Sequence, residues 1–303
     1  MAWEDALYWT DAARLSRISS LPRTTMTNTG ISSTSGLKRG RLAQKQVQWA
    51  FQLDGNFGWM QSFTDYFVSV DVDILVEHED ERPPYYDFSS PHLNGLSGSQ
   101  ARQRANDLLI LFNGMMRANF GADFYNFTIG EGRDLLRRGP IVGDYRETEP
   151  LLAFPDDVED LRYYRSHREL DQTGKELFLS RTDDHLRYIF LTLGREGLTF
   201  SSLYKVMETM KDYLEAKGSK SWKTDLATLG KKTAGDIVDF TYTANKFGVA
   251  GYSARHGIDS SFKPASKNKA VTLSQAVDIM TPIVRAFVHQ RVHQEFGRAW
   301  KQF

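Results

Sequence analysis

The stretch TLSQAVDIMTPIVRAFVHQRVHQEFGRA, residues 272–299, decides the fold class of the rear half of the chain. Its apolar residues recur at intervals of three and four, which places them on one face of an α-helix. Thr272 and Gln275 have the spacing of a capping box, so we expect a helix from about 273 to 299, kinked at Pro282. The apolar residues of this face are Leu273, Ala276, Val277, Met280, Ile283, Val284, Phe287, Val288 and Val292.

The same periodicity predicts further helices before this one. The segment 201–218 has an apolar stripe and ends at Gly218, a residue suited to the C-terminal cap of a helix. We therefore expect an all-helical bundle over residues 156–303. Its other predicted helices span 156–170, 184–196, 222–232 and 233–247.

Alternation of apolar and polar residues predicts strands in the front half. From Tyr66 to Glu77, apolar residues stand at every second position, and Asp71 and Asp73 lie on the opposite, wet face. Residues 46–53 have strand composition, and the turn residues Asp54, Gly55 and Asn56 lead into 57–63 as the second strand of a hairpin. The other expected elements are a loop over 77–87, a helix over 101–119 capped by Ser99, and strands over 122–130 and 139–147.

These patterns predict an α+β protein with two domains. An antiparallel sheet with a packed helix is expected over residues 1–155, followed by the helical bundle over 156–303. The net charge of zero conceals an asymmetry: residues 1–160 carry 15 Lys and Arg against 23 Asp and Glu, and residues 161–303 carry 23 against 15. The basic half is suited to an anionic partner, and two solvated surfaces of opposite sign are the alternative.

Composition excludes several classes of protein. The chain has no cysteine, which excludes disulfide frameworks, thiolate catalysis and cysteine-ligated metals. No apolar run approaches the roughly 20 residues that span a bilayer. The first residues, MAWEDALYWTDAARL, carry acids where a signal peptide carries lysines. We expect a cytoplasmic protein with no membrane partner.

The leading candidate site lies within residues 240–261, FTYTANKFGVAGYSARHGIDSS. His256 can exchange protons near neutral pH, and the adjacent Arg255 can hold a phosphate, with Asn245 as a further phosphate-binding group. Such a set is suited to cleavage of an RNA backbone. The alternative is structural, with Asn245, Arg255 and His256 tying a loop to the bundle through buried hydrogen bonds.

The chain has several predicted helices, then R-H-G at 255–257, and then one long amphipathic helix. This order of elements resembles the HEPN-like bundles of bacterial defence and toxin–antitoxin proteins. The likeness covers about residues 184–299. Active ribonucleases of that superfamily carry an arginine, four to six intervening residues and a histidine, and they cleave RNA without a metal. His256 matches that histidine, whereas Arg255 precedes it directly. The resemblance implies a defence setting and a metal-independent ribonuclease as one alternative function.

Other cations are candidates for nucleic-acid contact. Arg162, Arg165 and Arg168 alternate with tyrosines in LRYYRSHR, a mixture that can stack on bases and pair with phosphates, and we add Lys246 to this set. An amphipathic linker helix is the alternative for LRYYRSHR. His289 and His293 have a metal-ligand spacing, but Gln290 stands where a zinc protease has glutamate, so we assign no metal and no cofactor.

The sequence favours an interaction or regulatory protein whose basic half binds a macromolecular partner, either RNA or a protein. A ribonuclease centred on His256 is the first alternative. A structural subunit of a larger assembly is the second, and a homo-oligomer is open in each case. Whether the chain is an enzyme is not decided by these motifs.

Overall fold

The fold is described from a computed structural model. The chain divides into two compact units, Met1–Gln44 and Lys45–Phe303, and every residue that the structure describes belongs to the second. The boundary predicted near residue 155 falls outside the described residues and stays a prediction. The described residues are 47–67, 69–77, 84–136, 139–140, 154, 170–251, 254 and 269–299.

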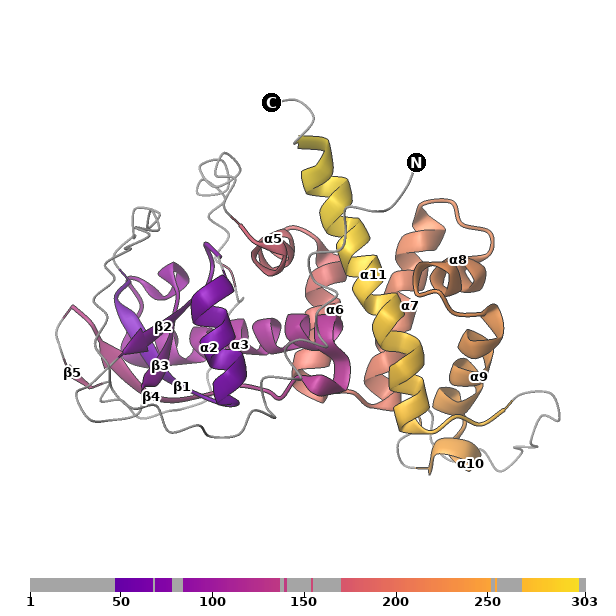
Figure 1. The fold of residues 1–303 in the computed structure, drawn as a ribbon, viewed down its shortest axis with the longest axis horizontal. Helices are drawn as coiled ribbons and strands as arrows, with labels where there is room; N and C mark the ends of the chain where they lie inside the picture. The colour runs from indigo at the N-terminus through magenta and orange to yellow at the C-terminus, as the bar shows by residue number, and fades with distance from the viewer. Residues whose placement is uncertain are drawn as a thin grey trace, which may run out of the picture. The chain divides into compact units, whose positions relative to one another are not determined.

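Five described strands form one antiparallel sheet in the order β2-β3-β1-β4-β5 (Figure 1). Central β1 buries Phe51 and Leu53, the alternate positions that face the core. The α+β class predicted from the sequence is therefore confirmed. The strands are β1 (Trp49–Asp54), β2 (Asp73–Glu77), β3 (Tyr85–Ser89), β4 (Thr128–Asp134) and β5 (Gly139–Pro140).

Helix α3, Gly98–Phe120, joins the sheet to the helical part of the fold (Figure 1). It contacts β1 and β4, and it also packs against α6 (Asp184–Glu196) and α11 (Leu273–Ala299). Its N-cap is Ser97, two residues before the predicted Ser99, and Ser97 forms a capping box with Gln100. One cluster of buried apolar side chains runs from Trp49 in the sheet to Val292 in the last helix.

The rest of the described fold is helical, as the apolar periodicity predicts. The capping box of Thr272 and Gln275 is confirmed, since each backbone N–H donates to the other side chain, at 2.8 and 3.2 Å. Gly218 adopts the left-handed conformation predicted for a helix end, with φ +89°. The remaining helices are α2 (Phe57–Tyr66), η2 (Pro91–Leu93), η3 (Gly121–Asp123), α5 (Gln172–Leu179), α6 (Asp184–Glu196), α7 (Phe200–Ala216), α8 (Trp222–Leu229), α9 (Ala234–Asn245), α10 (Phe247–Ala250) and α11 (Leu273–Ala299).

The hairpin predicted over 46–63 is wrong, because residues 57–63 belong to helix α2. Asn56, taken as a turn residue, is the N-cap of this helix, and its side chain accepts a hydrogen bond from the Trp59 N–H at 3.2 Å. The helix turns Phe63 toward α3, where its ring lies 5.2 Å from that of Phe112. Tertiary packing overrides the strand preference of these aromatic residues.

The strand predicted over Tyr66–Glu77 is confined to β2, and the predicted loop over 77–87 includes the start of β3. Asp71, predicted on a wet face, is completely buried because Arg181 and His92 pair with its carboxylate. The strand predicted over 122–130 begins only at Thr128, where β4 starts. Residues 156–169 of the helix predicted over 156–170, and residues 141–147 of the last predicted strand, lie outside the described residues.

Candidate functional site

A group of lysines surrounds α8. Residues 217–232 contain five lysines and one acidic residue, Asp225, whose carboxylate accepts a hydrogen bond from the Ser219 hydroxyl at 2.5 Å. Three lysines lie before or at the start of α8, and two follow its end. The eight residues of α8 span about 12 Å, the length of three to four phosphates along one nucleic-acid strand. We call Lys217, Lys220, Lys223, Lys231 and Lys232 the lysine patch.

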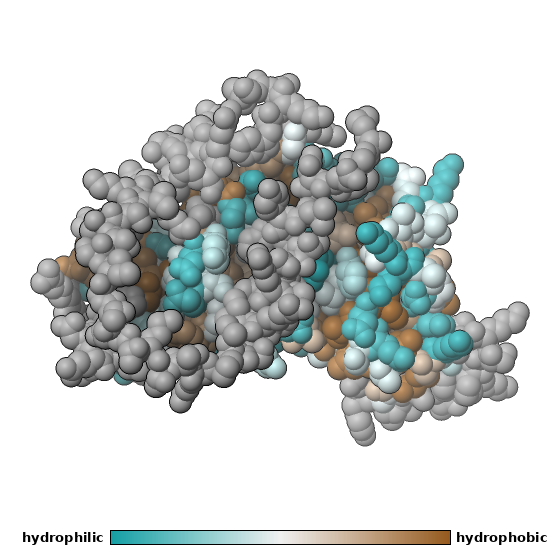
Figure 2. All heavy atoms as spheres, viewed as in Figure 1, coloured by the Kyte–Doolittle hydropathy of each residue, from teal (hydrophilic) through white to brown (hydrophobic). Residues whose placement is uncertain are grey.

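The lysine patch faces solvent. Lys217, Lys220 and Lys231 are exposed, and Lys223 and Lys232 are partly buried. Trp222 lies between two cations, with the Lys211 and Lys223 ammonium nitrogens 5.8 and 5.4 Å from its ring. In Figure 2, hydrophilic side chains project from the side of the molecule where Figure 1 places α8. This surface combines exposed positive charge with an aromatic ring.

Lys231 occupies a strained position at the end of α8. Its φ is +55°, and it is the only non-glycine residue with a positive φ in the described part of the chain. The Lys231 and Lys232 N–H groups donate to Thr228 and Ala227 carbonyls, a helix ending that usually has glycine where Lys231 stands. Holding lysine there costs roughly 1 kcal/mol relative to glycine. Strain of this kind often marks a functional position.

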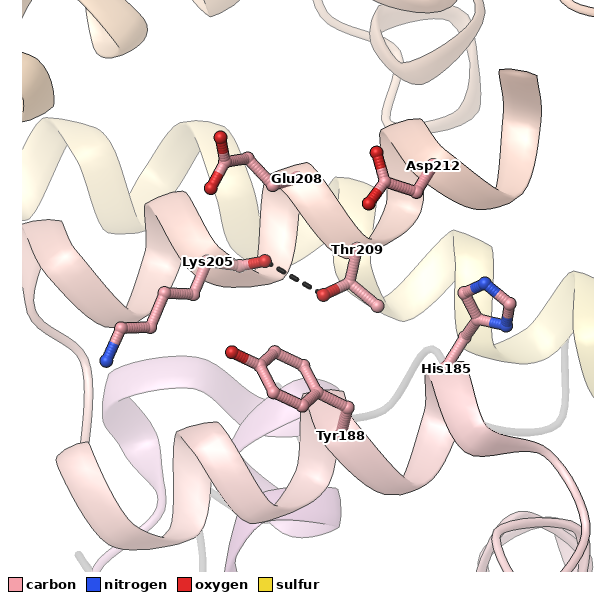
Figure 3. A pocket seen from close by; sticks show the side chains of 6 residues that line it. All are labelled: His185, Tyr188, Lys205, Glu208, Thr209 and Asp212. Atoms are coloured by element: carbon pink, nitrogen blue, oxygen red, sulfur yellow. Dashed lines mark hydrogen bonds between the residues drawn. The ribbon is translucent and has the colours of Figure 1, made fainter. Parts of the chain in front are cut away.

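A polar pocket of about 320 Å³ lies between α6 and α7. Figure 3 shows Tyr188 and His185 of α6 facing Lys205, Glu208, Thr209 and Asp212 of α7. The Thr209 hydroxyl donates to the Lys205 carbonyl at 2.9 Å, and the Lys205 ammonium pairs with Glu196 at 2.6 Å. With Lys205 paired and two carboxylates in its wall, this pocket is unfavourable for a phosphate, unlike the lysine patch.

A buried carboxylate, Glu176 of α5, joins α5 to α3 and α11. It is completely buried and accepts hydrogen bonds from the Asn119 and Gln172 amides at 2.5 and 3.0 Å. The Nε2 atom of His289 lies 3.5 Å from the Glu176 carboxylate and 3.1 Å from the Asn119 side-chain oxygen. Burial raises the pKa of Glu176 to about 7, although the two amides oppose this. Burial and Arg285 lower the pKa of His289.

A second buried carboxylate, Asp71, links the sheet to the turn after α5. Arg181 donates to Oδ1 of Asp71 through Nε at 2.6 Å and through a second nitrogen, and Nε2 of His92 lies 2.8 Å from the same oxygen. Burial alone would raise the pKa of Asp71, but Arg181 and His92 outweigh it and lower this pKa. Phe154 and Phe178 lie against the guanidinium, so the pair is structural in character.

The structure describes two of the residues predicted for the site. Asn245 ends α9, and its partly buried side chain has an oxygen without a hydrogen-bond partner among the described residues. Lys246 is the C-cap of α9, and its N–H donates to Thr243 at 3.3 Å. Arg255 and His256, like Arg162, Arg165 and Arg168, lie outside the described residues, so their roles stay predictions.

The sequence reasoning missed both the lysine patch and the Glu176 cluster. The signal for the patch was local, because five lysines within 16 residues exceed the average charge density of the chain, yet they do not form one run. The sequence gives His289 a metal-ligand spacing with His293, but nothing in it pairs His289 with Asn119 and Glu176. In the described part of the chain, no group of three or more His, Asp or Glu residues is arranged to hold a metal ion.

None of the described helices combines the length and apolar character needed to cross a membrane. Comparison of the chain with protein-family models, with curated proteins and with solved structures gives no match.

Proposed function

We propose that this chain is an interaction protein that binds nucleic acid through the lysine patch. The observation that carries the proposal is the arrangement of five lysines around both ends of α8, where Asp225 is hydrogen-bonded to Ser219 and Asp236, just beyond the patch, interacts with Lys232. Lysine ammonium groups bind backbone phosphates as point charges, which gives affinity without sequence readout. The positive charge of residues 161–303 supports the same partner.

The position of Lys231 supports the proposal independently. Gly230 cannot exchange places with Lys231, because a Cβ at position 230 would lie 2.3 Å from the Ile283 side chain. Glycine at position 231 would relieve the strain without any clash of this kind. The lysine therefore lowers stability relative to glycine, and it adds a positive charge at this end of α8.

Replacing Lys231 with glycine is expected to raise the stability of the fold and, at the same time, to weaken nucleic-acid binding. We expect the free energy of unfolding to rise by about 0.5–1 kcal/mol, because the left-handed strain disappears. Binding of a labelled duplex should weaken, and the slope of log K against log salt should become less negative by about 1. Urea unfolding and fluorescence anisotropy measure the two effects.

The control is Arg195→Gln, which removes one exposed cation on α6, outside the patch. It should leave the affinity for the duplex within about twofold of wild type. A Lys231→Gly variant that binds as tightly as wild type, with the same salt slope, would contradict the role of Lys231. Loss of affinity in the Arg195 variant alone would place the binding surface elsewhere.

A further inference from the structure

Helix α5 is a short element that buries one carboxyl group together with three apolar side chains. Its buried residues include Glu176, Leu177 and Leu179, and it contacts both α3 and α11. An eight-residue helix is too short to be stable in water without such packing. The stability of α5 therefore depends on the groups that it buries against α3 and α11.

The hydrogen bonds around Glu176 have a defined direction. The Asn119 amide nitrogen donates to Glu176 and to the Met115 carbonyl, at 2.5 and 3.1 Å, so the Asn119 oxygen must act as an acceptor. Nε2 of His289 then carries the hydrogen that Asn119 accepts. Asn119 thus connects the buried carboxyl group to an imidazole that is 46% exposed.

The charged groups around Glu176 do not neutralise its ionised form. Asp171, the N-cap of α5, opposes ionisation, and Arg285 of α11 favours it only weakly. Asp123 of η3 acts on Arg285 rather than on Glu176. His289 lies 3.5 Å from the carboxylate, but the partial burial of its imidazole, and then Arg285, lower its pKa and disfavour the charged form. An ionised Glu176 is consequently a buried anion held by two amides.

We propose that α5 is a proton-controlled latch, docked on α3 and α11 while Glu176 keeps its proton and released as that proton is lost. A carboxyl group whose pKa is raised in the docked state stabilises docking fully at pH values below its ordinary pKa near 4.5. That stabilisation is lost as the pH rises through about 7. Release of α5 would expose Leu177 and Leu179, which are buried in the docked state.

Amide hydrogen exchange of the full chain tests the latch. Protection factors of the α5 amides, corrected for intrinsic exchange, should fall by about 10- to 30-fold between about pH 5.5 and about pH 8. Those of α7 should stay nearly constant, and they serve as the internal reference. The Glu176→Gln variant cannot ionise, so its α5 protection should not depend on pH.

Two further variants make the test independent of how well Glu176→Gln folds. Gln172→Ala removes an amide that favours the ionised carboxyl, so the midpoint of the α5 transition should move to higher pH. Glu215→Gln removes an exposed carboxylate on α7 and should leave the transition unchanged. Equal α5 protection at both pH values, or a pH-dependent loss shared equally by α7, overturns the latch. Persistence of the transition in Glu176→Gln would do the same.

Discussion

The variant Gly194→Ala is expected to lose about 3–5 kcal/mol of unfolding free energy, a large share of the roughly 5–15 kcal/mol that stabilises a typical folded protein. Gly194 lies on α6 where that helix crosses α3, and a Cβ at this position would lie 1.9 Å from the Ile110 carbonyl oxygen. Gly114 makes the reciprocal contact on α3, since its Cβ would lie 1.7 Å from the Phe190 oxygen. Both obstacles are backbone atoms of a helix, which cannot rotate away.

Urea unfolding monitored by circular dichroism measures the loss. The matched control is Gly235→Ala on α9, where the nearest atom to the added Cβ is Oγ1 of Thr233 at 3.4 Å. That change should leave stability unaltered or raise it by up to about 1 kcal/mol, because alanine favours the helix. A Gly194→Ala variant as stable as wild type would mean that α3 and α6 lie too far apart for a Cβ at position 194 to meet the Ile110 carbonyl.

Replacing Arg181 with methionine is expected to cost about 3–5 kcal/mol at neutral pH, because it leaves the Asp71 carboxylate buried without its main counter-charge. Both side chains are deeply buried, with 7% of Arg181 and 0% of Asp71 exposed. The loss should shrink in acid. In the wild type, Asp71 has a lowered pKa and stabilises the fold above its ordinary value near 3.8, and this contribution is lost as the pH falls through the lower, folded value.

The control for this prediction is Lys205→Met, which breaks the exposed pair with Glu196. That pair should be worth no more than about 1 kcal/mol. The double variant Asp71→Asn with Arg181→Met should be more stable than Arg181→Met alone, since it no longer buries an unpaired charge. The two side chains are not coupled if adding Asp71→Asn to Arg181→Met lowers the free energy of unfolding by as much as Asp71→Asn lowers it in the wild type.

The long helices could be predicted because their apolar stripes are regular and their caps are local. Thr272 and Gln275 specify the start of α11 through residues only three apart, and Gly218 specifies the end of α7. Helix α2 could not be predicted in the same way. Its aromatic residues favour strands, and beyond the local cap at Asn56 the helix is stabilised by distant contacts such as that of Phe63 with Phe112.

The candidate sites depend on contacts that a single sequence does not reveal. Asn119 lies 57 residues before its hydrogen-bond partner Glu176 and 170 residues before its other partner, His289. Asp71 was expected on a solvated face because its partner Arg181 is 110 residues away. The strained φ of Lys231 is equally invisible in the sequence, since it belongs to a helix ending at which glycine is the usual residue. Local composition could have indicated only the lysine patch.

The most direct test of nucleic-acid binding by the lysine patch compares two doubly substituted variants in a salt series. One removes Lys220 and Lys231 from the patch, and the other removes the exposed Arg195 and Lys269 outside it, all by substitution with glutamine. Affinity for a duplex of about 20 base pairs is measured by anisotropy from about 50 to about 200 mM salt. We predict a wild-type slope of log K against log salt of roughly −3 to −4, reduced in magnitude by about 2 in the patch variant and unchanged in the other. Equal slopes in both variants, or no binding by the wild type at the lowest salt, would contradict the proposal.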